Sequence, residues 1–509
     1  MVGIDAPIRV VRWHLDFGEV FMSIPPTQTW HAMHDDLNLL ESPQPSQRCD
    51  ASPANHAIDL RLSEVVSALS CALDLTEGQP AGHAVRTCLL GMRLARMLGL
   101  DDTTRSALYY ALMLKDLGCS SNAARLSQLF GADDHVVKKN FKTTDWPRLI
   151  NAMQYIGRNI CPTGNIVQKL GRFIAIGVAG DKGARQMIKT RCERGASIAR
   201  LFGLTECTAQ TIQQLDEHYN GQGHPLGLKG EEISITARIA GLCQTVEVFL
   251  STYGLTAALD MARKRCGRWF DPMLVDLLVK LEHDDAFWQS MTDKHFHAEI
   301  GKHEPEDQRV YASDRQLDRV ALGFAQVVDA KSPWTRKHSE HVTELAVGIG
   351  RVMGFDDALT RWFRRAALLH DVGKLGVSNS ILDKPGKLTD AQRQVVMQHP
   401  RYTFQILSRV RGFEFLAQTA ASHHERLDGK GYHLGLEAKH LSKPVRALVV
   451  ADIFEAISAQ RPYRDTMPMD KVFAIMDDMV GTGICPEAFA ALRYHVDTMG
   501  YTPSRMTPA

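Results

Sequence analysis

The chain has 509 residues, of which 44% are apolar and 23% charged, so it is long enough for two to four globular domains. Its 59 Lys and Arg residues balance 58 Asp and Glu residues, and this near-neutral charge excludes a globally basic nucleic-acid binder. We find no apolar run of about 18 residues, no signal peptide, and ten cysteines scattered without a CxxC pair. These features predict a cytoplasmic protein with no membrane segment and no disulfide framework.

The first 56 residues carry weak structural signals. Residues 8–13 (IRVVRW) predict a short strand, and the Pro- and Ser-rich residues 42–53 predict a linker. From residue 57 onward the pattern is mostly helical, because apolar residues recur at every third or fourth position. This spacing predicts amphipathic helices at residues 60–73, 85–98 and 342–352. Since β-branched runs are few and short, the sequence predicts an all-α protein.

A weak internal repeat runs through the helical region. The segment GHAVRTCLLGMRLARMLGL at 82–100 resembles KHSEHVTELAVGIGRVMGF, which lies 255 residues later, and LKDLG at 114–118 has the same offset from LHDVG. Farther along, NGQGHPLGL at 220–228 resembles DGKGYHLGL, 208 residues later. The change of offset predicts a 47-residue insertion in the first copy, between Asp116 and Arg191. Such a repeat indicates two copies of one helical unit.

The repeat divides the chain into four predicted segments. Residues 1–56 form an N-terminal segment and linker, and residues 57–285 form the first copy of the helical unit. A charged linker follows at 286–312, and the second copy occupies residues 313–509.

The second copy holds an ordered series of metal-ligating residue types. Five histidines and two aspartates fall on mostly apolar helices: His338, His370, Asp371, His399, His423, His424 and Asp452. A single buried histidine has an ordinary explanation as a hydrogen-bonded core residue, but seven such side chains are costly to bury without partners. Divalent cations would satisfy all seven together, and the mixture of imidazole and carboxylate suits Fe, Mn, Zn or Co.

Residues 320–465 resemble the HD-GYP domain, a subfamily of the HD metal-dependent phosphohydrolases. The resemblance rests on five segments in the family's order: HDVGKLGV at 370–377, ILDKPGKLT at 381–389, HP at 399–400, HHERLDGKGY at 423–432, and Asp452 followed by RPYR at 461–464. It implies an all-α fold of two tandem HD-type bundles, the first of them degenerate.

The resemblance also implies two groups of three metal ligands joined by one bridging carboxylate. The first group is His338, His370 and Asp452, the second is His399, His423 and His424, and the bridging carboxylate is Asp371. Family members that bind a third metal carry a Glu four residues before the first histidine, where this chain has Trp334. We therefore expect two divalent transition-metal ions, Fe or Mn, with Zn, Co and Ni as alternatives.

A paired metal site suits phosphodiester hydrolysis, because two cations about 3.5–4 Å apart polarise the phosphoryl group and generate a hydroxide nucleophile near neutral pH. We expect Asp371 and Lys374 to act in catalysis, with Lys374 near the scissile phosphate. Arg461 and Arg464 offer donors for phosphate oxygens, and a solvated helix end is the less favoured alternative. By analogy with the family, Tyr432 contacts a guanine or a phosphate, the alternative being a packed aromatic ring.

The family's substrate is cyclic di-GMP, so the resemblance implies hydrolysis to pGpG and further to GMP. Three alternatives remain open: hydrolysis of 3′,3′-cyclic GMP-AMP, hydrolysis of another phosphate substrate, and a non-catalytic module that senses the dinucleotide or docks onto a GGDEF-domain synthase. A GGDEF-domain protein and a second copy of the chain are expected partners, whereas a nucleic-acid polymer and a membrane are not.

The family's GYP triplet reads Gly431-Tyr432-His433 here, so the loop lacks a proline that would stiffen it. None of the metal-ligating positions is affected, and we therefore expect catalysis to survive. We interpret His433 as a surface residue of this loop rather than as another ligand.

The first copy has lost most of the series. At the repeat offsets, Lys115, Arg191, Leu215, Asp216 and Gln244 replace His370, His399, His423, His424 and Asp452, while His83, Asp116 and Glu217 remain. The two cationic side chains would stand where metal ions should, which predicts ion pairs of Lys115 and Arg191 with Asp116. We expect this copy to be a regulatory or scaffold unit without catalytic activity.

Overall fold

The computed structural model describes residues 60–144, 155–162, 164–291, 300–305, 311–460 and 466–499. Within these ranges the chain forms α-helices, short 3-10 helices and isolated bridges, without a β-strand, so the all-α prediction is confirmed. The strand predicted at 8–13 and the linker predicted at 42–53 lie outside the described residues. No helix among the described residues is both long enough and apolar enough to span a bilayer.

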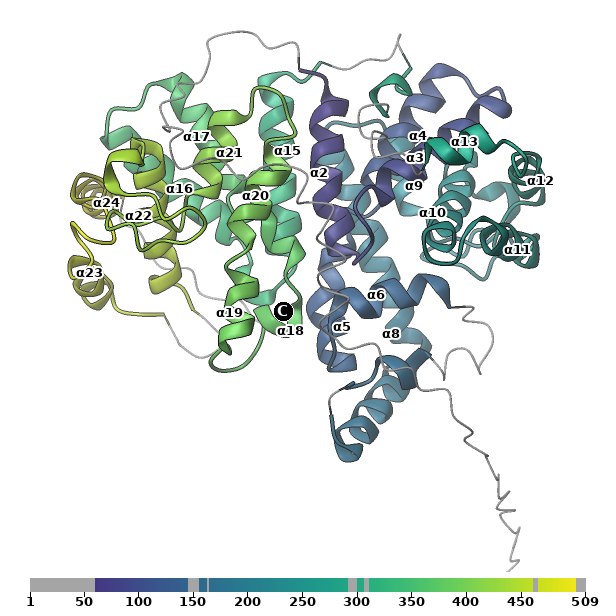
Figure 1. Cartoon of the computed structure of the whole chain (residues 1–509), viewed down its shortest axis with the longest axis horizontal. Helices are drawn as coiled ribbons and strands as arrows, with labels where there is room; N and C mark the ends of the chain where they lie inside the picture. The colour runs from purple at the N-terminus through teal and green to yellow at the C-terminus, as the bar shows by residue number, and fades with distance from the viewer. Residues whose placement is uncertain are drawn as a thin grey trace, which may run out of the picture.

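The helices of the N-terminal half are coloured purple to teal in Figure 1. They are α2 (Leu62–Thr76), α3 (His83–Met97), α4 (Asp102–Leu114), η2 (Cys119–Asn122), α5 (Ala123–Phe130), α6 (Asp134–Thr143), α8 (Ile166–Leu201), α9 (Glu206–Gln213), η3 (Gly230–Glu232), α10 (Ile235–Tyr253), α11 (Leu255–Arg265), α12 (Pro272–Lys280) and α13 (Asp285–Ser290). Helix α10 packs against α3, α4, α6, α9, α11 and α12.

The C-terminal half, green to yellow in Figure 1, repeats much of this order. Its elements are α15 (Asp314–Asp329), η6 (Pro333–Thr335), α16 (His338–Val352), α17 (Asp357–Leu369), η7 (Val372–Gly376), α18 (Asn379–Leu382), α19 (Asp390–Val396), α20 (His399–Leu407), α21 (Glu414–Ala421), η8 (Ala438–His440), α22 (Lys443–Ser458), α23 (Met469–Asp477) and α24 (Pro486–Met499). The short η4 (Ile300–Lys302), which precedes them, packs against α3 of the first half.

Corresponding helices of the two halves start in the same way. Asp101 caps α4 by accepting a hydrogen bond from the Thr104 amide, and Asp356 caps α17 by accepting one from the Leu359 amide. An aspartate at this position satisfies an amide that the first turn of a helix leaves unpaired. The same local signal therefore starts the helix that precedes the HD motif and the helix that precedes its degenerate counterpart.

Helix α2 differs from its predicted amphipathic character, because it is buried on nearly every side. Even Ser63, Ser70 and Asp74 are buried, since α2 packs against α3 and α4 of its own half and against η7 and α20 of the other half. Figure 1 shows α2 at the junction of the two halves. In return, α15 of the second half packs against α8 and η2 of the first.

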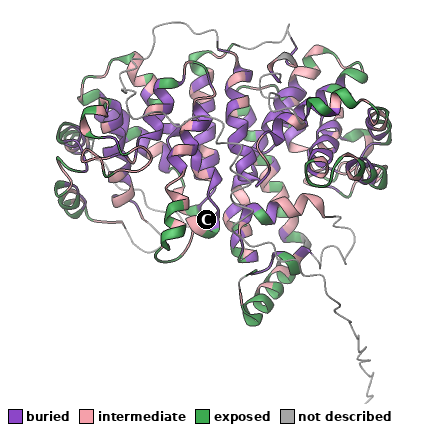
Figure 2. Cartoon of the chain, in the orientation of Figure 1, coloured by how far each residue is buried: buried purple, intermediate pink, exposed green. Residues whose placement is uncertain are grey.

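Because of these contacts, the largest hydrophobic core is continuous across the junction of the two halves. It contains side chains of α2 to α4 and α8 to α13 together with those of α15, α17, η7, α20 and α21. Phe202 and Phe324, for example, stack across the junction with ring centroids 5.7 Å apart. A second core is confined to the C-terminal half, where α16 packs against α22 and α24. Figure 2 shows buried segments on both sides of the junction.

A buried polar cluster also joins the two halves. The carboxylate of Asp134, at the start of α6, accepts hydrogen bonds from the Asn379 amide (2.8 Å) and the Ser378 hydroxyl (3.1 Å). The ammonium of Lys331 lies 3.7 Å from Asp134 and 3.1 Å from Nε2 of His135. Lys331 lies shortly before His338 in the chain, and Asn379 lies shortly after His370 and Asp371. The cluster therefore connects the first half to the segments that flank these residues of the second copy.

The segment predicted as a linker at 286–312 is packed where it is described. Glu304 is buried and accepts hydrogen bonds from the hydroxyls of Ser63 (2.7 Å) and Tyr110 (2.6 Å). Trp288 and Ile300 belong to the large core. This connection is therefore held against the first half by buried contacts.

Candidate metal centre

The seven histidines and aspartates singled out in the second copy converge on one place. They come from five elements of the C-terminal half: His338 begins α16, His370 and Asp371 follow α17, His399 begins α20, His423 and His424 follow α21, and Asp452 lies within α22. All of them except His424 are buried, and the His424 side chain is 23% exposed. The mostly apolar helices thus bring distant polar residues to a single interior site.

Asp371 stands between two sets of imidazoles. Its Oδ2 lies 3.4 Å from Nε2 of His338 and 3.3 Å from Nε2 of His370. Its Oδ1 lies 3.3 Å from Nε2 of His399 and 3.5 Å from Nε2 of His423. One carboxylate oxygen therefore faces each side of the site, which is the geometry that a bridging ligand needs.

The remaining groups complete the two sides. Asp452 places Oδ1 at 3.4 Å from Nε2 of His338 and Oδ2 at 3.8 Å from Nδ1 of His424. The ligand atoms of His338, His370 and Asp452 lie within 4.8 Å of one another, and so do those of His399, His423 and His424. These are the same two triads that the family resemblance implied.

Backbone carbonyls fix the ring orientations of three of the five histidines. Nδ1 of His370, His399 and His423 lies 2.6 to 2.7 Å from the backbone carbonyl three residues earlier. A neutral imidazole that donates its Nδ1 proton to a carbonyl presents the lone pair of Nε2 on its other side. Three separate backbone carbonyls therefore aim three Nε2 lone pairs at the centre, as the hydrogen-bond partners of metal-bound histidines do.

His338 is oriented by a side chain that the sequence analysis did not identify. Its Nδ1 lies 2.6 Å from Oε2 of Glu455, which is buried one turn beyond Asp452 on α22. In the first copy, Glu247 makes the same contact with Nδ1 of His83. The only sequence signal was that Glu247 and Glu455 are separated by the repeat offset of 208 residues.

The donor set fits divalent cations. Among the described residues, neither Nε2 of His370 nor Oδ1 of Asp371 has a hydrogen-bond partner, although both atoms are buried. Unpaired buried polar atoms are rare and need a partner such as an ion. Nitrogen and carboxylate oxygen donors in two adjoining groups suit first-row transition metals.

On one side of the site the ionisation favours cation binding, whereas on the other side nearby carboxylates outweigh burial and raise the pKa values of His338 and His370. Burial lowers the pKa of His399 to about 4 and also lowers the pKa values of His423 and His424. Although burial alone would raise the pKa of Asp371, His370 and Lys374 hold it well below its ordinary value. At neutral pH these three imidazoles are therefore neutral and the carboxylate is ionised, which is the state that binds metal.

Gly373 of the HD motif is required by a close approach of two backbones. Any side chain at this position would collide with the carbonyl of His399. The hydroxyl of Thr403 links the same segments, because it accepts a hydrogen bond from the Gly373 amide (3.0 Å) and donates one to the His370 carbonyl (2.9 Å). In the first copy Gly118 approaches the carbonyl of Arg191 in the same way. The backbone arrangement is therefore kept in the first copy, although the metal-ligating side chains are not.

Two of the four residues expected to contact substrate lie at the mouth of the site. Nζ of Lys374 is 2.5 Å from Oδ2 of Asp371, and its side chain is 21% exposed. The ring of Tyr432 lies against the ring of His424, with centroids 4.6 Å apart. Arg461 and Arg464 lie outside the described residues, so their roles stay predictions from the sequence.

Glu425, the residue after the histidine pair, anchors the GYP-like loop. Its carboxylate accepts hydrogen bonds from the amides of Leu434 (2.8 Å), Gly435 (3.3 Å) and Leu436 (2.8 Å). Glu217 in the first copy accepts hydrogen bonds from three amides of the equivalent loop. Glu217 therefore has a structural partner of its own and is not a remnant metal ligand.

His433, which replaces the proline of the GYP triplet, is more buried than we expected for a surface loop. Its φ angle is 106°, a backbone conformation that favours glycine, and its ring lies 6.4 Å from that of Phe404. The side chain is half-buried, and Nε2 has no hydrogen-bond partner among the described residues. The loop has therefore adopted a conformation that proline, with φ fixed near −65°, could not reach.

Restoring the family's proline should harm this chain. We expect His433→Pro to lower the free energy of unfolding by about 2 kcal/mol or more, because the loop must leave its observed conformation. His433→Gly is the matched control and should raise stability by up to about 1 kcal/mol, since glycine adopts this φ without strain. Denaturant unfolding of the three proteins measures both effects. Equal stability of the proline and glycine variants would contradict this account of the loop.

The centre of the first copy is filled by the protein's own cations. Lys115 forms an ion pair with Asp116, as predicted, but Arg191 pairs with Asp216 instead, so the prediction of its partner was wrong. Lys142, from the predicted insertion, lies 2.9 Å from Oε2 of Glu77 and 3.4 Å from Oδ1 of Asp116. The insertion thus supplies a buried ammonium that sequence offsets alone could not place.

This charge cluster predicts a measurable sensitivity to acid. Although burial alone would raise the pKa of Glu77, Lys142 draws it down to about 2, below its ordinary value of 4.5. A depressed carboxyl pKa stabilises the fold above pH 4.5, and this stability is lost as the pH falls from 4.5 to 2. The loss should be on the order of 3 kcal/mol. Unfolding measured across this window should vary less with pH in Glu77→Gln, and an unchanged pH dependence would disprove the assignment.

Comparisons with known proteins agree with the geometry. A family model described as the HD domain matches residues 182–274 and 324–487, one match in each copy. Over 432 residues the chain is 42% identical to the 3′3′-cGAMP-specific phosphodiesterase 3 of Vibrio cholerae, covering 85% of this chain and 94% of that protein.

Two further relatives extend the comparison. The chain resembles the crystal structure of a cyclic GMP-AMP-specific phosphodiesterase from V. cholerae with a TM-score of 0.60 and 38% identity, covering 87% of this chain and all of that chain. A cyclic di-GMP phosphodiesterase of Thermotoga maritima is 36% identical over 161 residues, which are 31% of this chain and 43% of that protein.

Proposed function

The chain belongs to the HD domain family, in its HD-GYP branch, and from this we propose that it is a metal-dependent phosphodiesterase of cyclic dinucleotides. We propose further that 3′,3′-cyclic GMP-AMP is its preferred substrate. The single observation that supports catalysis best is Asp371, whose two oxygens face two separate triads of ligating side chains. A binding module that had lost its activity would have no need of a complete pair of triads.

The proposed role of each residue follows from its position in the site. His338, His370 and Asp452 would hold one cation and His399, His423 and His424 the other, with Asp371 shared. The two cations would supply Lewis-acid chemistry, polarising the phosphodiester and lowering the pKa of the attacking water.

The chain's own side chains orient the substrate. Lys374 reaches the centre from a partly exposed position, so its ammonium can bind a phosphate oxygen and stabilise the charge that develops on it. Tyr432 lies over His424 at the same mouth and limits how a nucleotide enters.

The choice of substrate rests on the coverage of the relatives. The relative and the solved structure that match most of the chain are both named as specific for cyclic GMP-AMP. Cyclic di-GMP, which the sequence analysis placed first, is the second candidate because the cyclic di-GMP phosphodiesterase of T. maritima also matches part of the chain. The GGDEF-domain partner, the homodimer, the cytoplasmic location and the regulatory or scaffold role of the first copy stay predictions.

The test combines metal analysis with product analysis. The full chain would be purified without oxygen, its metal content measured by plasma mass spectrometry, and each cyclic dinucleotide incubated separately for chromatography of the products. We expect about two metal ions per chain and faster cleavage of 3′,3′-cyclic GMP-AMP than of cyclic di-GMP. Faster cleavage of cyclic di-GMP would reverse the substrate order, and no cleavage with iron or manganese supplied would refute the enzyme.

The orienting role of Glu455 gives a separate prediction. Glu455→Ala leaves the seven proposed ligands in place but frees the ring of His338 to rotate, so metal affinity should fall about 10- to 100-fold. Competition with a coloured chelator measures that affinity directly. Glu247→Ala is the matched control, because it removes the same contact in the first copy and should leave metal affinity unchanged.

A further inference from the structure

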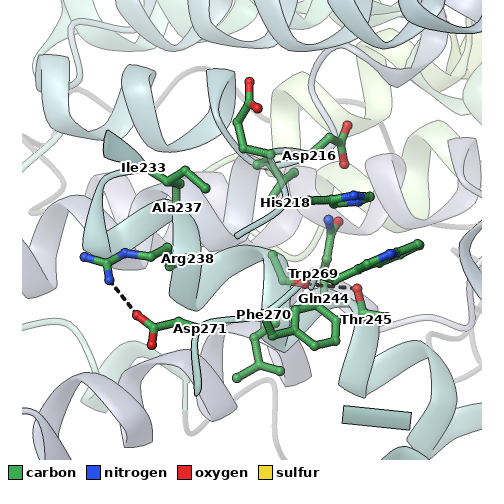
Figure 3. A pocket seen from close by; sticks show the side chains of 14 residues that line it. Asp216, His218, Ile233, Ala237, Arg238, Gln244, Thr245, Trp269, Phe270 and Asp271 are labelled. Atoms are coloured by element: carbon green, nitrogen blue, oxygen red, sulfur yellow. Dashed lines mark hydrogen bonds and ion pairs between the residues drawn. The ribbon is translucent and has the colours of Figure 1, made fainter. Parts of the chain in front are cut away.

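The internal hollow of the first copy is too small for an organic ligand. It lies between α10 and the residues that follow α9, and it encloses about 50 Å³, which is room for a few water molecules. Figure 3 shows polar side chains along it, among them Asp216, His218, Gln244 and Thr245. The surface of this copy has a more unusual feature, which lies on α8.

The first part of α8 forms an arm whose apolar side chains are exposed. Gly180, with φ 51° and ψ −157°, interrupts the helix, and residues 166–179 before it are here called the arm. Large apolar side chains of the arm are 43% to 83% exposed, namely those of Ile166, Val167, Leu170, Phe173, Ile174 and Val178. Because each residue of a helix advances by about 100°, these side chains fall on one side of the arm, here called the apolar stripe. A continuous exposed stripe of this kind marks an interaction site.

A different side of the arm anchors it to the first copy. Ile176 packs against a small core that includes Phe130, Val137, Tyr155 and Ile160. This core belongs to α5, α6 and the residues before the arm, and Figure 2 shows exposed helix at this lower end of the first half. The side chains of the apolar stripe are not part of the small core, so the described residues leave the stripe uncovered.

The charges near the apolar stripe limit what can cover it. Residues 155–179 contain Arg158, Lys169 and Arg172 and no acidic residue. If the arms of two copies paired along their stripes, these cations would face like charges, which is unfavourable. The stripe therefore favours an occupant that is apolar on one side and acidic beside it.

One segment of the same chain, outside the described residues, has this character. Residues 30–41 (WHAMHDDLNLLE) carry apolar side chains at intervals of three, four and three, at Trp30, Met33, Leu37 and Leu40. This spacing predicts an amphipathic helix. The segment also has acidic side chains at Asp35, Asp36 and Glu41, and neither Lys nor Arg. It therefore complements the apolar stripe in both hydrophobicity and charge.

The segment can reach the apolar stripe. Residues 42–59, which separate it from the described chain, can span up to about 60 Å. The path is shorter, because α2 is about 22 Å long and its last turn lies against α6, where Nζ of Lys138 is 2.8 Å from the Thr76 carbonyl. Helix α6 shares the small core with the arm. A tether of this length gives the segment an effective concentration on the order of a millimolar, which a free partner protein or a membrane would have to exceed.

We propose that residues 30–41 dock as an amphipathic helix along the apolar stripe, with their acidic side chains beside Lys169 and Arg172. A free helix this short is marginally stable in water, so the segment becomes helical where the stripe covers its apolar side. The contact lies in the first copy and involves none of the proposed metal ligands. It therefore goes beyond the proposed phosphodiesterase activity.

Amide hydrogen exchange of the full chain, followed by mass spectrometry, tests the docking. Residues 30–41 should exchange about tenfold more slowly than the same sequence in a free synthetic peptide. Protection of this size is expected when the effective concentration is about ten times the dissociation constant.

Two pairs of variants locate the contact. Ile174→Asp puts a charge into the apolar stripe and should return residues 30–41 to the exchange rate of the free peptide. Ala175→Asp, at the next position and on an exposed but different side of the arm, is the matched control and should leave the protection unchanged. Leu37→Asp should release the segment and speed exchange in the arm itself, whereas Asn38→Asp should do neither.

Four results would each overturn the proposal. Two concern exchange: residues 30–41 that exchange as fast as the free peptide in the unaltered chain, and protection that survives Ile174→Asp. Binding to phosphatidylserine vesicles that Ile174→Asp abolishes would assign the apolar stripe to a membrane. A dimer that Ile174→Asp abolishes, without protection of residues 30–41, would assign the stripe to a second copy.

Thermal melting checks that the Ile174→Asp variant is folded. If it is not, Leu37→Asp decides, because this substitution lies outside the packed helices and its effect is read as faster exchange in the arm. None of these results depends on metal content or turnover, so a failure of the phosphodiesterase proposal would be recognised separately.

Discussion

Replacing Asp371 with alanine is expected to remove both bound metal and turnover. This carboxylate faces four imidazoles, two on each oxygen, so its loss removes the ligand that both proposed metal positions share. Two metal ions supply several kcal/mol of transition-state stabilisation, and activity should therefore fall at least about a thousandfold. Plasma mass spectrometry and chromatography of the products measure the two losses on the same sample.

Asp116→Asn is the control for this experiment, because Asp116 occupies the same place in the first copy and pairs with Lys115 there. It should leave metal content and turnover close to those of the unaltered protein. Retention of two metal ions by Asp371→Ala would contradict the bridging role, even if activity were lost.

Asp134→Ala is expected to be the most destabilising single substitution outside the metal centre. The Asp134 carboxylate is fully buried and faces the equally buried ammonium of Lys331 across the junction. The buried ammonium of Lys138 lies still closer to Asp134, at 3.2 Å, so the substitution deprives two buried cations of this carboxylate, which costs about 3–5 kcal/mol. Denaturant unfolding should show this loss as a lower midpoint.

The double variant Asp134→Asn with Lys331→Met removes both charges of the pair across the junction but keeps Lys138, and it should recover part of the lost stability. Asp133→Ala is the neighbouring control: its partly exposed carboxylate caps α6 and makes no contact across the junction, so its loss should cost about 1 kcal/mol. Equal losses for Asp133→Ala and Asp134→Ala would show that the contact across the junction contributes no more than a helix cap.

The sequence predicted the helices well because their information is local. Apolar spacing and capping residues are read within a few positions, and the structure has helices at 62–76, 83–97 and 338–352, close to the predicted ranges. The convergence of the seven histidines and aspartates could be predicted only from the family resemblance. The sequence separation of His338 and Asp452 does not by itself indicate that the two side chains lie close together.

What the sequence could not predict depends on contacts between distant segments. Glu455 lies 117 positions from His338. Lys142 enters the first copy's centre from an insertion that has no counterpart in the repeat. The partners of Arg191 and Lys331 are fixed by tertiary packing, because a buried charge pairs with whichever opposite charge the fold brings close.

The shared core has a consequence for assembly. In a symmetric dimer, two subunits exchange equivalent contacts, and dilution separates them according to mass action. Here α2 and α15 exchange such contacts within one polypeptide, so the effective concentration of each half for the other is set by the connecting chain. The association of the two halves is therefore independent of protein concentration. Because they belong to one polypeptide, the two halves are always present in equal number.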